Sequence, residues 1–295
     1  MRKIQLSIFI IILATSCKKV FDVKPDDFNV TLLNTSLKAG DTARFEIEGN
    51  PDFITFYSGE KGNNYEYRNR TVADSSIPQL NFTSFGQNLS ALHPSSLSLL
   101  VSTDYKEDTT TINNSTWTNI TNRATLSTGS TNTASGIINL ADFRSFDSIY
   151  FAFKYNTSAG VSAVQPTWTI QSFTLSNLSF PDSLVHSINT IANTGWQIVD
   201  IATTDKRWVA SSTQISISGA PTLSAANNDW AITKLFLKRV NPDKGVPIKQ
   251  IIERVGFYSY RFTKSGNYTV AFLATNSKNG NNSYEIVKKI NVVVN

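Results

Sequence analysis

Apolar and polar residues alternate along short stretches of this chain, and turn-forming residues separate those stretches. In "SIYFAFKY" (148–155) every second residue is bulky and apolar. The same period of two recurs near the end of the chain, at 258–262, 268–272 and 284–294. It is typical of a β-strand with one buried face, whereas a helical period is weak and confined to 183–191. The pattern therefore predicts an all-β protein.

Further stretches of this kind, each bounded by Gly, Asn, Asp or Pro, are also predicted as strands. In the first part of the chain they are "FNVTLL" (28–33), "ARFEIEG" (43–49), "FITFYSG" (53–59) and "YEYRNR" (65–70). In the middle they are "SLSLLVSTDY" (96–105), "GIINL" (136–140), "TWTIQSFTLSNLSF" (167–180), "GWQIVDI" (195–201), "RWVASSTQISISG" (207–219) and "NDWAITKLFLK" (228–238). Residues 72–81 indicate a linker, and 106–130 indicate a long polar loop that contains "TWTNI" (116–120).

The composition agrees with this fold class. Of the 295 residues, 40% are hydrophobic and 17% are charged, which is typical of a folded globular protein. Phe (18), Tyr (10) and Trp (5) suit strands, and abundant Ser, Thr and Asn suit turns. The formal net charge is +5, but the basic residues are scattered, so we expect no nucleic-acid partner.

The first 17 residues, "MRKIQLSIFIIILATSC", have the layout of a secretory signal, with Arg2 and Lys3 before an apolar run. That run is too short to remain as a membrane-spanning helix. Cys17 is the single cysteine and stands where a bacterial lipobox places its lipidated residue; the alternative is an ordinary cleaved signal with an incidental cysteine. We predict a lipoprotein signal peptide over 1–17, a tether over 18–27, and membrane contact through the lipid anchor only.

The three strands predicted at the end of the chain would leave one face of a sheet uncovered if they were alone. Their order of Tyr, Gly, Tyr-x-Val and a final Asn resembles the second half of polycystic-kidney-disease-type (PKD) immunoglobulin-like domains. The residues Phe56, Gly59, Glu60 and Gly62 stand where that family has its Trp-x-Phe-Gly-Asp-Gly turn. The first half of such a sandwich is therefore expected near the start of the chain.

The middle of the chain resembles a second family. "LLVSTDY", "TWTNI", "INLADF", "IYFAFKY" and "TWTI" are similar to the later strands of choice-of-anchor J or cleaved-adhesin jelly rolls, and "GWQIVDIATTDKRWVAS" and "NDWAITKLFL" to their first strands. Essentially the whole mature chain resembles a Bacteroidota lipoprotein family, domain of unknown function 5017, most specifically in "FYSGE", "VSTDY", "RWVASS" and "NDWAIT". The resemblance implies an Ig-like (PKD-type) β-sandwich over 28–75 and 249–295, split by a permuted jelly-roll (galactose-binding-like) sandwich over 76–248.

Catalysis has little support in the sequence. His93 and His186 are the two histidines, both in polar contexts that suggest loops, so a metal site with several imidazoles is excluded. A Ser–His–Asp arrangement would have to use one of these two. Paired carboxylates could still serve glycoside hydrolysis, but the acidic residues lie mostly in turns. We therefore predict that the protein is not an enzyme.

Binding of a glycan has better support, because all five tryptophans fall in the middle segment. Exposed aromatic rings stack on sugar rings, and polar side chains bind the hydroxyls. Trp168 and Trp230 lie among apolar neighbours and are expected in the core. Trp117 in the polar loop, and Trp208 beside Asp205, Lys206 and Arg207, are candidates for an exposed platform. The candidate ligand-binding residues are therefore Trp117, Trp208, Arg207 and Asp205.

A structural Ca²⁺ is a further hypothesis, and no other cofactor is expected. Asp104, Glu107 and Asp108 cluster within five residues at the end of a predicted strand, and Asp229 is a candidate neighbour in the fold. Carboxylate oxygens suit Ca²⁺, although such a cluster is also typical of a solvated turn.

The sequence thus favours a non-catalytic, lipid-anchored glycan-binding protein of a polysaccharide-capture system. It would lie in the bacterial cell envelope, on the periplasmic face or the cell surface of the outer membrane. The alternatives are an adhesin-like or assembly module that binds another protein, and, less favoured, a hydrolase.

Overall fold

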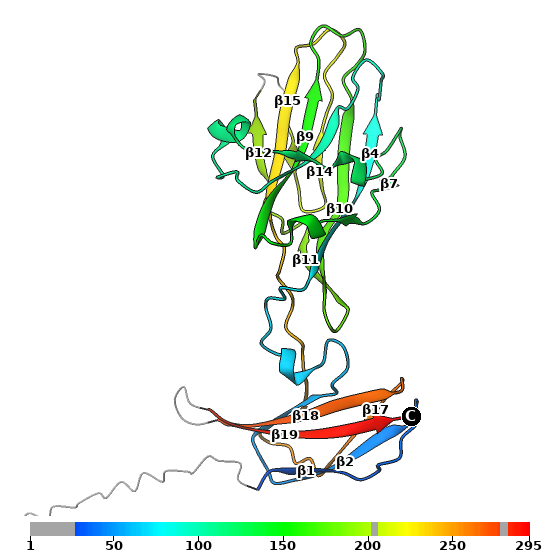
Figure 1. Cartoon of the computed structure of the whole chain (residues 1–295), viewed down its shortest axis with the longest axis vertical. Coiled ribbons are helices and arrows are strands. Elements are labelled where there is room, and N and C mark those ends of the chain that lie inside the picture. The colour runs from blue at the N-terminus through cyan, green and yellow to red at the C-terminus, as the bar shows by residue number, and fades with distance from the viewer. Residues whose placement is uncertain (1–26, 202–205, 278–282) are drawn as a thin grey trace, which may run out of the picture. The chain divides into compact units, whose positions relative to one another are not determined.

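The computed structural model describes residues 27–201, 206–277 and 283–295, and these divide into two compact units. Of these described residues, unit 1 contains those up to Ser58 together with those from Gly245 onward, and unit 2 contains those between Gly59 and Lys244. Residues 59–75 and 245–248 therefore belong to the other unit from the one the sequence suggests. Strands dominate both units, as Figure 1 shows, and the prediction of an all-β sandwich protein is confirmed.

Unit 1 consists of two antiparallel sheets that share one core. The three-stranded sheet has the order β1 (Asn29–Leu32), β2 (Thr42–Glu48), β17 (Phe257–Arg261). The four-stranded sheet has the order β16 (Val246–Lys249), β3 (Phe53–Tyr57), β18 (Gly266–Ser277), β19 (Ser283–Val294). Each sheet thus combines strands from both ends of the chain.

Aromatic rings fill the space between these two sheets. Phe45 on β2, Phe56 on β3 and Phe272 on β18 are all fully buried. The Phe272 ring centroid lies 5.1 Å from that of Phe45 and 5.1 Å from that of Phe56. Tyr258 on β17 contacts Phe56 with its centroid at 4.7 Å. The core of unit 1 therefore depends on side chains from both segments.

Unit 2 also has two antiparallel sheets. One has the order β13 (Val209–Ala210), β14 (Gln214–Ile217), β10 (Thr167–Ser179), β4 (Ile77–Gln87), β7 (Thr133–Ala134), with β11 (Leu184–Thr190) on β10 and β8 (Ile138–Asn139) on β4. The five-stranded sheet has the order β12 (Gln197–Asp200), β15 (Asn227–Phe236), β9 (Ser148–Thr157), β5 (Leu97–Ser102), β6 (Thr118–Asn119). Short 3₁₀ helices occur at η1 (Tyr65–Tyr67), η2 (Thr109–Asn114), η3 (Thr121–Arg123) and η4 (Ala141–Phe143).

The main core of unit 2 lies between its two sheets. The alternation in β9 is confirmed, since every second side chain from Ile149 to Tyr155 is buried in this core. On the facing sheet, Trp168 is 4% exposed and its indole Nε1 donates to Ser96 Oγ at 3.0 Å. Trp230 is also buried, at 3% exposure, so the prediction that both tryptophans pack is confirmed. None of the helices in the part of the chain that the structure describes has the length and apolar character of a membrane span.

Three local expectations were wrong. The strand expected at 65–70 is instead η1, because the Asn64 side chain accepts from Glu66 N at 3.0 Å and caps a helical turn. The weak helical period at 183–191 belongs to strand β11, which pairs with β10. The expected linker at 72–81 contains the start of β4, a central strand of its sheet.

We predict that Phe56→Ala destabilises unit 1 by about 3–5 kcal/mol, because it removes a fully buried ring and leaves a cavity among its neighbours. Phe257→Ala on β17 is the matched control. This ring is 60% exposed, so its loss is expected to change the free energy of unfolding by no more than about 0.5 kcal/mol. Denaturant unfolding checks both values, and equal effects of the two substitutions would contradict this description of the core.

Candidate functional site

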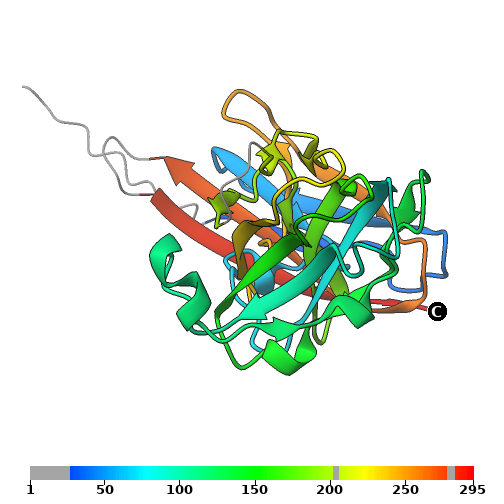
Figure 2. The same cartoon turned by 90° about the horizontal axis from the view of Figure 1, so that it is seen from above.

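The outer side of the five-stranded sheet carries a second, smaller apolar cluster. Because side chains alternate along a strand, β9 and β15 direct one set of residues to the main core and the other set to this outer side. The segment after β5 folds over it, and Figures 1 and 2 show η2 outside the sheet. The buried members are Leu100, Tyr105, Ile112, Ala152, Val199, Trp230 and Ile232, with Trp117 and Tyr150 partly buried against them.

Trp117 is half-buried on this outer side. Its ring centroid lies 5.0 Å from that of Trp230 and 5.5 Å from that of Tyr105. The indole Nε1 donates to Ile112 O at 2.9 Å, which fixes the ring against η2. The sequence-based candidate therefore lies at the surface with one side packed and the other accessible.

A pocket of about 320 Å³ opens on the same outer side of the sheet. At its edge the Tyr150 hydroxyl donates to Glu107, and Lys234 Nζ lies 3.4 Å from Glu107 Oε1. The Tyr105 hydroxyl donates to Gln197 Oε1 at 3.0 Å. The pocket is lined by Glu107, Tyr150, Gly195, Gln197, Ile232, Thr233 and Lys234.

Charges around this pocket are held by specific partners. The Tyr150 hydroxyl and Lys234 hold the pKa of Glu107 below its usual value. Burial raises the pKa of Tyr150, and its hydrogen bond to Glu107 raises it further. Lys154 Nζ lies 4.8 Å from the centroid of the Trp230 ring, and burial lowers the pKa of this lysine. The site thus combines accessible aromatic surface with both hydrogen-bond donors and acceptors.

The predicted Ca²⁺ site at Asp104, Glu107 and Asp108 is not formed. Asp104 accepts from Ser102 Oγ at 2.7 Å, and Asp108 accepts from Thr110 N at 2.9 Å and so caps η2. The three carboxylates thus have separate local partners. Among the described residues, no group of three or more His, Cys, Asp or Glu side chains is placed to hold a metal ion.

The expectation that Trp208 is exposed is wrong. Trp208 is 2% exposed and belongs to the core between the sheets, where its indole Nε1 donates to Asp229 O at 3.3 Å. It lies on the opposite side of the five-stranded sheet from Trp117, so the two rings form no common platform. Arg207 is exposed beside it, and Asp205, like Cys17, lies outside the described residues.

Ser179, His186 and Asp182 come together in unit 2, but their hydrogen bonds differ from those of a catalytic triad. Asn241 N donates to His186 Nδ1 at 3.1 Å, so the imidazole carries its proton on Nε2, which lies 2.9 Å from Ser179 Oγ. The Ser179 hydroxyl in turn donates to Asp182 Oδ1 at 2.6 Å. This histidine therefore has no free nitrogen to accept the serine proton. Ser179 is fully buried, and His186 lies in strand β11 and not in a loop.

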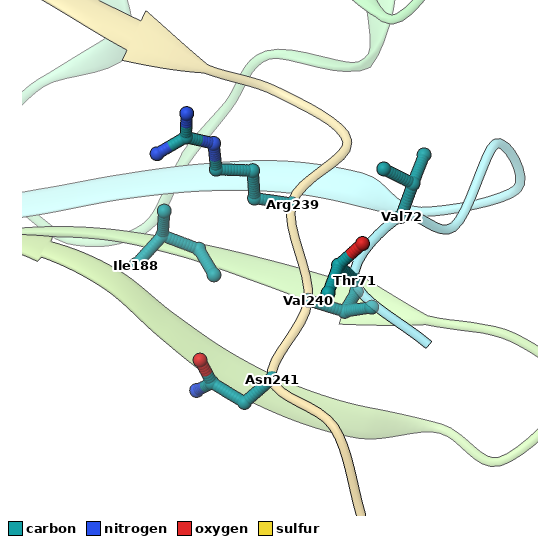
Figure 3. Close-up of a pocket in the computed structure, with 6 residues that line it drawn as sticks. All are labelled: Thr71, Val72, Ile188, Arg239, Val240 and Asn241. Atoms are coloured by element: carbon teal, nitrogen blue, oxygen red, sulfur yellow. The ribbon is translucent and has the colours of Figure 1, made fainter. Parts of the chain in front are cut away.

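A larger pocket, of about 470 Å³, lies in unit 2 where the chain leaves β15 (Figure 3). Val240 N donates to Thr71 O at 3.0 Å, so two neighbouring backbone segments form its floor. Arg239 is its charged lining residue, and the guanidinium of Arg239 stacks on the Phe236 ring at 3.6 Å. The pocket thus offers one cation and small apolar side chains, without an acid or base for catalysis.

Sequence reasoning missed Tyr150, Gln197 and Lys234. All three lie at alternate positions whose neighbours face the main core, and this alternation is the signal that could have placed them on the outer side. Their meeting with Glu107 could not be read from the sequence, because it depends on how the segment after β5 folds back.

Comparison with known families gives one match. The model of a family described as a domain of unknown function (DUF5017) matches residues 16–196, which is more than half of the chain. This range is shorter than the whole mature chain over which the sequence resembles that family. No curated protein and no solved structure matches the chain significantly.

We predict that Glu107 titrates below its ordinary pKa of 4.5 in the folded protein. Since the folded-state pKa is lowered, the interaction stabilises the fold above the unfolded-state pKa and is lost as the pH falls through the folded-state pKa. Carboxyl NMR titration measures the midpoint. Tyr150→Phe removes the main cause and should raise the Glu107 midpoint, whereas Asp108, held by Thr110, should not respond. An unchanged Glu107 midpoint would contradict the assignment.

Proposed function

The chain belongs to the DUF5017 family, and we propose that this member is a non-catalytic glycan-binding protein whose binding surface is the outer side of the five-stranded sheet. The observation that carries this proposal is the juxtaposition of Trp117 and Tyr150, both half-buried, with the pocket at Glu107, Gln197 and Lys234. Rings that are packed on one side and accessible on the other lose little conformational freedom when a ligand stacks on them.

A sugar has the surface chemistry that fits this site. Its ring presents C–H groups that stack on aromatic faces, and its hydroxyls both donate and accept hydrogen bonds. Lys234 supplies a donor, Glu107 an acceptor, and Gln197 both.

The same geometry supports binding without catalysis. A general acid for glycoside hydrolysis needs a carboxyl group whose pKa is raised toward neutral pH. Glu107 has the opposite shift, because Tyr150 and Lys234 stabilise its ionised form. Asp104 also has a lowered pKa, chiefly through its hydrogen bond from Ser102. Neither group is therefore suited to protonate a leaving group.

The start of the sequence supports a place in the bacterial cell envelope. A secretory signal that ends at Cys17 would leave a lipid-anchored protein, on the periplasmic face or the cell surface of the outer membrane. We propose that it captures polysaccharide there, as the resemblance to Bacteroidota lipoproteins suggests. In this proposal, unit 1 is the PKD-type Ig-like domain and unit 2 is the inserted jelly roll.

A second candidate function, binding of a protein partner, is favoured by one feature of unit 1. Ile252 is 94% exposed, and Ile251 and Phe257 are more than half exposed. Exposed apolar side chains of this size are typical of protein contacts when they gather in a patch. Strand addition at β19 is disfavoured, because Lys288 faces the inner side of this edge strand, as charged residues do on edges that avoid pairing.

We predict that Trp117→Ala weakens binding of the preferred glycan about tenfold or more, because it removes one stacking face. A glycan array with the full chain, purified in mild detergent, identifies the ligand, and calorimetry then compares the variants. Lys234→Gln tests the same surface without disturbing the aromatic packing and should also weaken binding.

Phe146→Ala is the control for this experiment. Phe146 is an aromatic residue of unit 2 that is 42% exposed and lies outside the pocket, so its loss should leave the affinity unchanged. An absence of glycan binding at millimolar concentrations, or equal affinity of Trp117→Ala and the unsubstituted protein, would reject the proposal. Capture of a protein that is lost in Ile252→Ser would support the second candidate instead.

A further inference from the structure

Two acidic residues face each other across β12 and β15. In the register of this antiparallel pair, Asp200 lies directly opposite Asp229. Trp230, the next residue on β15, belongs to the outer cluster, and Ala231 belongs to the main core. By alternation, Asp229 and Asp200 are on the inner side of the sheet, at the end of the core. Like charges in directly opposed positions of a sheet are destabilising unless something neutralises them.

The buried member of this pair has no hydrogen-bond donor. Asp229 is fully buried, and neither of its carboxylate oxygens has a hydrogen-bond partner among the described residues. Asn227, two positions earlier on the same side of β15, is also fully buried, and its Oδ1 has no donor either. Its amide Nδ2 donates to Lys206 O at 2.8 Å, so the side-chain atom without a hydrogen-bond partner is Oδ1. Three buried oxygens thus lie near each other without a donor.

An arrangement of this kind is costly as it stands. A buried polar atom without a hydrogen-bond partner destabilises the folded state, and a buried unpaired charge does so more strongly. Burial raises the pKa of Asp229 and the neighbouring Asp200 raises it further, whereas Asn227 and Arg207 lower it by less. Arg207 is exposed, and none of the ion pairs among the described residues involves Asp229. The protein's own side chains therefore compensate the buried charge only in part, and the three oxygens keep no hydrogen-bond donor.

We propose that Asp229, Asp200 and Asn227 bind a hard divalent cation of the Ca²⁺ class. The donor set consists of oxygens alone, two carboxylates and one amide, which is the chemistry that Ca²⁺ prefers. Asp200 is exposed at the edge strand β12, so the ion has access from solvent and keeps water ligands on that side. By binding side chains of both strands, the cation links β12, the edge strand of the five-stranded sheet, to β15.

A proton shared between Asp200 and Asp229 is the competing explanation for this cluster. The two explanations differ in how many of the three buried oxygens gain a partner. One proton on Asp200 or Asp229 provides a single hydrogen bond, which joins two oxygens, so at least one of the three buried oxygens stays without a partner. A cation of six to eight ligands accepts all three at once. The site is also separate from the proposed glycan surface, because the two are on opposite sides of the sheet, so either can fail without the other.

The test uses the full chain, stripped with EDTA and titrated with CaCl₂ or TbCl₃. We expect sensitised Tb³⁺ emission on tryptophan excitation, because the Trp208 indole lies 3.3 Å from the backbone oxygen of Asp229. We also expect Ca²⁺ at a hundredfold excess over its dissociation constant to raise the melting temperature by about 5 °C.

The variants locate the site. Asp229→Asn keeps the shape and removes the buried charge, so its melting temperature in EDTA should be no lower than that of the unsubstituted protein, and its Ca²⁺ response should be lost. Asp200→Asn lies at the exposed edge and should weaken Ca²⁺ binding at least tenfold. The matched control is Asp108→Asn, a surface carboxylate of the same unit that caps η2 and should retain the full response.

Two results would overturn the proposal. The first is an unsubstituted protein with neither Tb³⁺ emission nor a Ca²⁺-dependent shift in melting temperature, which leaves the shared proton as the explanation. The second is a Ca²⁺ response that persists in Asp229→Asn. If Asp229→Asn does not fold, Asp200→Asn decides the question: loss of the response supports the site, and an undiminished response rejects it.

Discussion

Backbone hydrogen bonds between the beginning and the end of the chain are the constraint on which unit 1 depends. β2 pairs with β17, and β3 pairs with β18, so neither segment can complete a sheet without the other. Side chains reinforce this closure: Asp52 N donates to Asn276 Oδ1 at 2.8 Å across 224 positions, and Ser277 N donates to the Asp52 carboxylate. The entropy cost of such a closure grows only with the logarithm of the intervening length.

Unit 2 also joins its own two ends, since Lys244 N donates to Gly62 O at 3.1 Å, and an inserted segment is tolerated when its two ends lie close together.

The strands could be predicted wherever burial on one side alone determined the sequence pattern. The alternation that ends at Tyr155 gave β9, and the aromatic alternation after Phe257 gave β17, β18 and β19, because a period of two leaves a residue little choice of side. The prediction failed where a local cap decided the structure. Tyr65 and Tyr67 have the composition of a strand, yet the side chain of Asn64 caps a turn, and Arg68 stacks on the Tyr65 ring. The intrinsic preference of tyrosine for strands is small, and specific contacts such as these outweigh it.

The candidate site was less accessible to sequence reasoning, because its residues come from four separate parts of unit 2. Charged neighbours suggested an exposed Trp208, but the burial of a ring is decided by what packs on it from distant strands, here Phe153 at 6.3 Å between centroids. The acidic residues after β5 suggested a metal site, but Asp104 and Asp108 have hydrogen-bond donors nearby in sequence, and Glu107 pairs with Tyr150 and Lys234 of two other strands. Conversely, the sequence indicated Asp229 only as a candidate neighbour of the acidic residues after β5, at the start of a predicted strand. Its burial beside Asp200 follows from strand register, which a single sequence does not contain.

The register of β15 links the two proposed sites. This strand sends Trp230, Ile232 and Lys234 to the outer side and Asp229, Ala231 and Leu235 to the inner side. A slip of one residue would exchange the two sets, placing a lysine in the main core and removing the rings from the surface. The apolar residues of β9 and β15 that fill the main core therefore also determine where a glycan or a cation can bind. For the same reason, a cation between Asp200 and Asp229 would hold β12 in the register that places Gln197 opposite Ile232 in the pocket. Stability at the inner side and recognition at the outer side are thus two consequences of one strand alignment.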